Sequence, residues 1–144
     1  MAAPVAAYVP AIRVGDLVYS SGQLPSVAGQ LIAVGKVGAE VTAEVGAECA
    51  RTVVLNALAA VSEQAGGIDE IERIVRVVIF VASAPDFTGQ PQVGNGASEV
   101  LGELFGDAGR HARSAVGVAV LPLDAPVEVE LVVQVRHRPS IIPV

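Results

Sequence analysis

The sequence contains one cysteine, no tryptophan and few aromatic residues of any kind, only 3%. A lone thiol, Cys49, excludes a disulfide within the chain and offers no zinc-ligand spacing, so we expect a small core cysteine and no metal site. We find no apolar run of 18 residues, the length that suggests a membrane span. Residues 1–5 show neither a basic region nor a signal-like apolar core. We therefore expect a cytoplasmic, reducing environment and no membrane partner.

Positive charge is also scarce, because 9 Lys and Arg stand against 15 Asp and Glu, for a net charge of −6. An acidic protein repels the phosphate backbone, so a nucleic-acid partner is not expected. Apolar residues make up 52% of the chain, and with so few aromatics the core must consist of Val, Ala, Leu and Ile, a composition that favours sheet. The length of 144 residues indicates a single domain over 1–144, with a core at about 8–136 and a short C-terminal tail.

Two segments have the pattern of helices. Thr42 can cap a helix that runs to about Ala65 on apolar positions three and four apart, and Gly66–Gly67 ends it. A second helix is predicted over Pro91–Phe105, where several glycines each cost up to ~1 kcal/mol relative to alanine and so indicate close packing or a functional approach. The side chains expected to point inward from it are Val93, Ala97, Leu101 and Leu104.

The other predicted elements are strands: Ile12–Val14, Leu17–Ser21, a short one at Gln30–Ala33, Ile71–Ala82, Arg113–Leu121 and Val127–Arg136. The first two form a hairpin about Gly15 and Asp16. The strand Ile71–Ala82 is so apolar that we expect it to be buried on both faces. The order of the elements along the chain is strands, helix, strand, helix and two strands. This order predicts an α+β fold with one mixed sheet and two helices on one face. The opposite face is then apolar and available for self-association.

Arg113 and Glu128 are the candidate functional pair. If the valine faces of the last two strands both meet the helices, these two charges share the helix-free side, where Ala115 leaves room for a ligand. A planar guanidinium grips a carboxylate bidentately, and a glutamate can orient water or act as a general base. From the pattern alone, ordinary interface ion pairs account for both charges better.

The spacing of the pair bears on assembly. In a hairpin matched on its valine faces, Arg113 lies opposite Gln134, six residues or ~20 Å along the strand from Glu128. That is too far for one small substrate, so a shared site requires different chains of a closed ring.

Motifs at both ends of the chain resemble the Rid (YjgF) family. Its C-terminal signature is similar to residues 112–122 (ARSAVGVAVLP) and 127–130 (VEVE). Its N-terminal motif is similar to residues 8–10 (YVP), 15–18 (GDLV) and 20–25 (SSGQLP). Residues 84–88 (APDFT) and 95–98 (NGAS) resemble a branch with a longer entry to the second helix. The resemblance covers about 8–135.

The resemblance implies a chorismate-mutase-like fold, a homotrimer with clefts between subunits, and no metal or cofactor. It implies that Arg113 binds a substrate carboxylate and that Glu128 helps to place an attacking water. Tyr8, Ser21 and Gly22 would line the cleft, Gly22 through its backbone.

The family archetype hydrolyses reactive enamines and imines to 2-keto acids and ammonia. It has a cysteine two residues after its arginine, where this chain has Ala115, so thiol chemistry is not expected, although the Ala115 carbonyl can still hold a water. Asn95 either binds ligand or caps a turn, and His111 lies either at the cleft mouth or at a solvated strand end.

Three functions compete. The expected one is hydrolytic deamination of 2-imino acids, on a small carboxylate-bearing imine as substrate. The alternative is non-catalytic binding of a carboxylate or keto acid for sensing or regulation. An endoribonuclease, a label that some family members carry, is opposed by the acidic charge and by the lack of a histidine–lysine pair.

Overall fold

The structure is a computed structural model that describes residues 7–137, so the predicted tail beyond 138 lies outside the described residues. Its helices are α1 (Ala43–Ala65) and α2 (Gln90–Phe105), with short 3₁₀ turns η1 (Ile68–Glu70), η2 (Gly106–Gly109) and η3 (Pro122–Asp124). Its strands are β1 (Ala11–Val14), β2 (Leu17–Ser20), β3 (Ser26–Val27), β4 (Gln30–Leu31), β5 (Ile71–Ala82), β6 (Ala112–Val118) and β7 (Val127–Val135).

The ends of α1 lie where the sequence predicts them. The Val45 amide donates to the Thr42 hydroxyl at 3.1 Å, and Gly66 adopts a left-handed φ of 90°. By length and composition α1 is apolar enough to cross a membrane, but half of its most apolar window is buried inside the protein. Cys49 is buried on this helix, and burial, with a smaller contribution from Glu48, raises the pKa of its thiol to about 11. Its role is packing.

The glycines of α2 show why the helix tolerates them. A Cβ on Gly96 would collide with the carbonyl oxygen of Ala47, so the two helices touch there through their backbones. Close packing, one of the two explanations offered for these glycines, is therefore confirmed at Gly96. One inward residue was predicted wrongly, because Leu104 is 51% exposed and Val100 is buried in its place.

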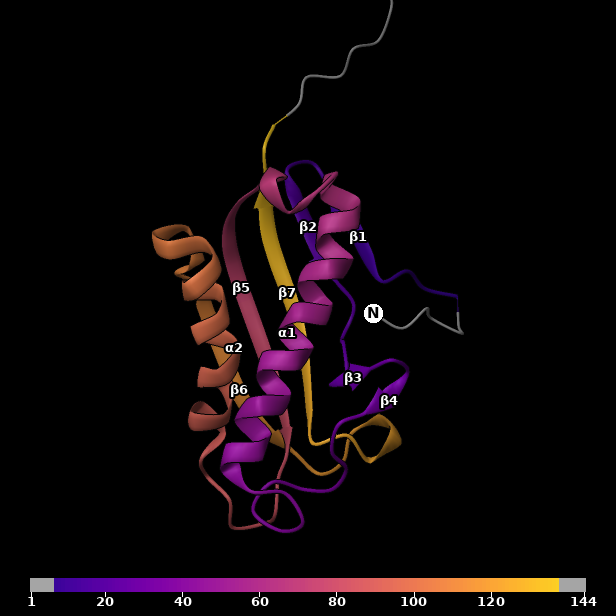
Figure 1. Ribbon diagram of the computed structural model, residues 1–144, viewed down its shortest axis with the longest axis vertical. Helices are drawn as coiled ribbons and strands as arrows, with labels where there is room; N and C mark the ends of the chain where they lie inside the picture. The colour runs from indigo at the N-terminus through magenta and orange to yellow at the C-terminus, as the bar shows by residue number, and fades with distance from the viewer. Residues whose placement is uncertain (1–6, 138–144) are drawn as a thin grey trace, which may run out of the picture.

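A mixed five-stranded sheet in the order β1-β2-β7-β5-β6 lies under the two helices (Figure 1). Only β5 and β6 are parallel, and the other neighbours are antiparallel. The α+β class, the one-sided helix layer and the hairpin at Gly15 are confirmed. The predicted hairpin of the last two strands is wrong, because β5 lies between them and Ile79 pairs with both Ala115 and Val129.

The two faces of the sheet differ in burial. On the helix side, Val77, Ile79 and Val81 of β5 are fully buried. On the open side, Val78 and Phe80 are only half-buried and Arg76 is exposed. The expectation that β5 is buried on both faces is therefore wrong for the single chain, since no layer covers its second side.

Candidate functional site

Arg113 lies on β6, the strand at one edge of the sheet. It pairs with Val77, and Ala115 pairs with Ile79, so both point to the helix face. This corrects the predicted helix-free placement. The exposed Val116 points to the open face instead, because β6 at the sheet edge does not turn its valines toward the core. Glu128, level with Phe80, does lie on the open face as predicted.

The Arg113 guanidinium is bound to neutral acceptors of α2. Its Nη1 donates to Asn95 Oδ1 at 2.8 Å and to Ser98 Oγ at 3.2 Å, and its Nη2 makes a long contact of 3.5 Å to the Pro91 carbonyl. Within residues 7–137, no carboxylate lies within salt-bridge distance of it. The half-buried guanidinium therefore has no anionic partner among these residues, and its positive charge is available to bind an anion.

The space predicted beside Ala115 is occupied by α2. A Cβ built on Gly94 would lie 3.3 Å from the Ala115 side chain and 3.4 Å from Arg113 Nη1. The helix therefore covers this part of β6 closely, and Ala115 packs against the core. A ligand of Arg113 must approach from the outer edge of the sheet.

Two polar residues next to Arg113 had alternative roles in the sequence analysis. Asn95 is an acceptor for Arg113 within α2 and caps no turn. His111 is half-buried and bonded on both nitrogens, through Nδ1 to the Gly109 carbonyl at 2.6 Å and through Nε2 to Ser98 Oγ at 2.9 Å. The prediction that His111 is a solvated residue at a strand end is therefore wrong. Sequence reasoning gave Ser98 no role, although it ends the motif at 95–98 (NGAS) and lies three residues after Asn95 on the same helix.

Glu128 lies beside Gly22. A Cβ on Gly22 would overlap the Glu128 carboxylate, so the missing side chain makes room for that group. Paired backbone bonds between Gln23 and Val129, of 2.8 and 3.1 Å, hold the two segments together. Burial, reinforced by the charge of Glu130, raises the pKa of the Glu128 carboxyl.

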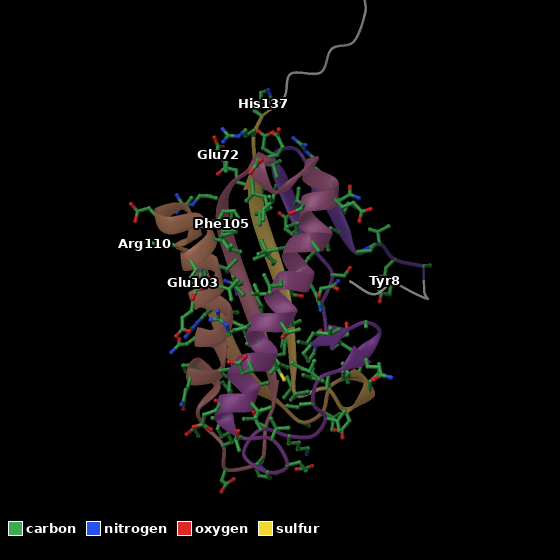
Figure 2. The ribbon with its side chains drawn as sticks, viewed as in Figure 1. Tyr8, Glu72, Glu103, Phe105, Arg110 and His137 are labelled. Carbon is green, nitrogen blue, oxygen red and sulfur yellow. The ribbon has the colours of Figure 1, made fainter. Side chains whose placement is uncertain are left out.

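The remaining predicted residues lie on the same side as Glu128. The Ser21 hydroxyl donates to the Val9 carbonyl at 2.6 Å, which fixes the segment that carries Tyr8. Tyr8 is 55% exposed and lies beyond β1, at the opposite edge of the sheet from β6 and α2 (Figure 2). We call Tyr8, Ser21, Gly22 and Glu128 the Glu128 corner, and Arg113, Asn95, Ser98 and Ala115 the Arg113 corner.

The two corners do not meet in one chain. Arg113 is level with Leu131 across β5, three residues from Glu128, and the two strands are separated by β5. Strand spacing and rise then place the Cα atoms of Arg113 and Glu128 about 14 Å apart, with side chains on opposite faces. In the part of the chain that the structure describes, no group of three His, Cys, Asp or Glu is placed to hold a metal.

Comparison with known proteins places this architecture in a family. The family model described as "YjgF/chorismate mutase-like, putative endoribonuclease" matches residues 1–135. Protein TCP17 of Trypanosoma cruzi is 40% identical over 139 residues, which cover 94% of this chain and 86% of that protein.

Two solved structures share the fold closely. A protein of unknown function from Agrobacterium tumefaciens has a TM-score of 0.88 at 40% identity, covering 94% of this chain and 87% of that one. A protein from Shewanella oneidensis, titled a putative endoribonuclease, has a TM-score of 0.89 at 33% identity, covering 93% and 89%. With its mixed sheet, its two helices and a family match over nearly its whole length, the chain belongs to the YjgF/chorismate mutase-like family.

Proposed function

We propose that the protein hydrolyses reactive 2-imino acids, and their enamine tautomers, to 2-keto acids and ammonia, at sites formed between chains of a cytoplasmic homotrimer. The observation that carries the proposal is the state of Arg113. Its side chain is held by an amide oxygen, a hydroxyl and a backbone carbonyl, none of which neutralises it. In a chain of net charge −6, such a cation is suited to a small carboxylate that arrives from outside.

The reaction asks little more of the protein than placement. The carbon of a protonated imine is already electrophilic, so a positioned water adds to it, the water loses a proton, and the resulting carbinolamine expels ammonia. Arg113 would hold the substrate carboxylate, which fixes the position of that carbon. Glu128 would accept the proton of the water as a general base.

The separation of the two corners supports sites formed between chains. Arg113 and Glu128 face opposite sides of the sheet, so they act on one small substrate only if they come from different chains. The open face supports such an assembly, because it exposes apolar side chains that no helix covers: Ile12, Val14, Tyr19 and Val116. In a closed ring each chain contributes its Arg113 to one site and its Glu128 to another.

The alternative is a site that binds a carboxylate or keto acid without turning anything over. Arg113 serves that function equally well, and the Glu128 corner then has no catalytic part. A third possibility is that Arg113 meets only a carboxylate of a neighbouring chain, as an interface ion pair. Turnover distinguishes the proposed function from both alternatives, and ligand binding distinguishes the two alternatives from each other.

The test is a competition for a transient imine. An L-amino-acid oxidase produces the 2-imino acid, semicarbazide traps it, and the purified protein competes for it. We expect the protein to lower semicarbazone formation in proportion to its concentration, and Arg113→Ala to have no such effect. Unchanged trapping together with calorimetric binding of pyruvate would establish the binding module instead. Unchanged trapping with no binding would refute both.

A further inference from the structure

We propose that Ser98 and His111 are positioning residues which fix the Arg113 guanidinium by its Nη1 and leave its Nε–Nη2 edge to receive a carboxylate. The inference rests on the proposed function, which assigns the substrate carboxylate to Arg113. Ser98 and His111 lie on α2 and just before β6, and neither is assigned a role by the proposed function.

The hydrogen bonds form a chain with one direction. The Gly109 carbonyl can only accept, so His111 Nδ1 donates to it at 2.6 Å. In a neutral imidazole this leaves Nε2 as the acceptor, and the Ser98 hydroxyl donates to it at 2.9 Å. The Ser98 oxygen then offers its lone pairs to Arg113 Nη1, at 3.2 Å. His111 thus decides which way the Ser98 hydroxyl points.

The chain leaves one edge of the guanidinium open. Both hydrogens of Nη1 are taken, one by Asn95 Oδ1 and the other by Ser98 Oγ. Nη2 makes only the long contact to Pro91, and Nε has no hydrogen-bond partner among residues 7–137. Parallel bonds from Nε and Nη2 match the two oxygens of a carboxylate. The site therefore takes a planar carboxylate side-on, which fixes the direction in which the rest of the ligand extends.

Close backbone approaches hold this arrangement in place. A Cβ on Gly109 would collide with the Leu101 carbonyl, so η2 packs directly on α2 and brings the Gly109 carbonyl to His111. A Cβ on Gly94 would come within 3.4 Å of Arg113 Nη1. Gly102, on the same helix, has nothing within 4 Å of such an atom. Contact at Gly94 keeps α2 close to Arg113, and contact at Gly109 keeps η2 close to α2, whereas the helix has free space at Gly102.

A simpler role is that these bonds only hold β6 to α2. A purely structural contact would change the unfolding transition and leave ligand affinity alone. A positioning role acts through Arg113, so its effect must disappear when the guanidinium is absent. The experiments below use that difference.

The first experiment reads the chain of bonds without any ligand. In the full-length ¹⁵N-labelled protein, long-range ¹H–¹⁵N correlation identifies the tautomer of each histidine. We expect His111 in the Nδ1–H form, and we expect Ser98→Ala to broaden or merge the resolved Nη1 signals of Arg113. An Nε2–H tautomer at His111, or Arg113 signals unaffected by Ser98→Ala, would overturn the proposal.

The second experiment measures imine hydrolysis and pyruvate binding. We expect Ser98→Ala to raise KM, and the Kd for pyruvate, about tenfold through the loss of a hydrogen bond to a charged group, with kcat within about twofold. Ser98→Thr keeps the hydroxyl and should restore affinity, and His111→Phe should resemble Ser98→Ala. His137→Asn is the matched control, because that histidine is exposed and bonded only to Asp16.

The Arg113→Lys background completes the test. In arginine, Ser98 holds one nitrogen while two others bind the ligand, but a lysine has only one side-chain nitrogen. Ser98→Ala should therefore have no further effect on KM in the Arg113→Lys protein. An unchanged KM in Ser98→Ala, or the same tenfold change in both backgrounds, contradicts a positioning role. If the wild-type protein neither hydrolyses imines nor binds pyruvate, the proposed function fails, and the NMR measurement still decides whether Ser98 and His111 fix Arg113.

Discussion

The Arg113 corner and the Glu128 corner are built in opposite ways. Arg113 is tied by three neutral acceptors to a helix of its own chain, so its position is set before any ligand arrives. Glu128 lies on the open face of the sheet, and among the described residues no hydrogen bond or ion pair fixes its carboxylate. The difference teaches that a single chain completes the binding half of the proposed site, whereas the proton-accepting half awaits a neighbour.

The largest expected effect is the loss of the Arg113 side chain. We expect Arg113→Ala to lower kcat/KM for imine hydrolysis about a thousandfold, because two charge-assisted hydrogen bonds to the carboxylate disappear. Arg113→Lys should recover only part of this, since an ammonium cannot bind both oxygens in the same geometry. Circular dichroism and light scattering should show unchanged fold and assembly. Turnover close to that of the wild type in Arg113→Ala would show that the Arg113 corner is not the binding half.

Mixing two inactive variants tests whether the corners of different chains meet. Arg113→Ala and Glu128→Ala should each be inactive alone. After unfolding and refolding together in equal amounts, about a quarter of the sites of a closed ring should combine an intact Arg113 with an intact Glu128. We expect activity to recover to about that fraction of the wild-type value. No recovery, although light scattering shows mixed trimers, would contradict sites shared between chains. A wild-type protein that is monomeric would contradict them as well.

A smaller effect, on stability, should report the environment of Glu128. Because its pKa in the folded chain is raised, the stability it contributes is present below the pKa of an unfolded carboxyl and is lost as pH rises through the folded value. At neutral pH and monomeric dilution, Glu128→Gln should therefore unfold at higher urea concentration than the wild type, and the difference should vanish on acidification. In the assembled protein, Arg113 of a neighbouring chain should stabilise the ionised carboxylate, so Glu128→Gln should then lower the urea concentration of unfolding. A rise in that concentration for both the monomer and the assembly would indicate that no cation of a neighbour reaches Glu128.

The smallest expected effect is that of chelation, which should leave turnover unchanged. Neither corner requires a metal for the proposed chemistry, and the described residues offer no ligand cluster. Activity measured after dialysis against EDTA, with and without added zinc, provides the check. A loss on dialysis that zinc restores would mean that another group activates the water, and Glu128 would lose its role.

The elements that the sequence predicts correctly have local signals. Thr42 and Gly66 mark the ends of α1 because a side-chain oxygen satisfies a free amide at one end and a left-handed residue closes the other. Gly15 adopts φ 62° in the hairpin that joins β1 to β2. Apolar residues three and four positions apart identified the helices, runs or alternation of apolar residues identified the long strands, and the motifs at the chain ends identified the family.

The placement of Arg113 depends on contacts between distant segments. In Ala112–Val118 the valines lie on one side and Arg113 and Ala115 on the other, which predicts that the valines face the core. At this sheet edge the parity is the reverse, because Arg113 and Ala115 pair with the core residues Val77 and Ile79. Strand order was missed for a related reason. A parallel pairing of β5 with β6 needs the α2 crossover, and nothing within β6 or β7 indicates that β5 separates them.

The sequence by itself determined the helices, the hairpin, the mixed α+β class and the residue types available for the chemistry, because each of these depends on a few adjacent side chains. Only the tertiary structure decided that Arg113 lies under α2 against Ser98 and Asn95, and that Glu128 lies on the opposite face. The reason is physical: a hydrogen bond between a strand and a helix 15 or 18 residues apart in sequence forms only where packing brings the two backbones together. Here Gly94 allows α2 to approach Ala115 and Arg113 of β6.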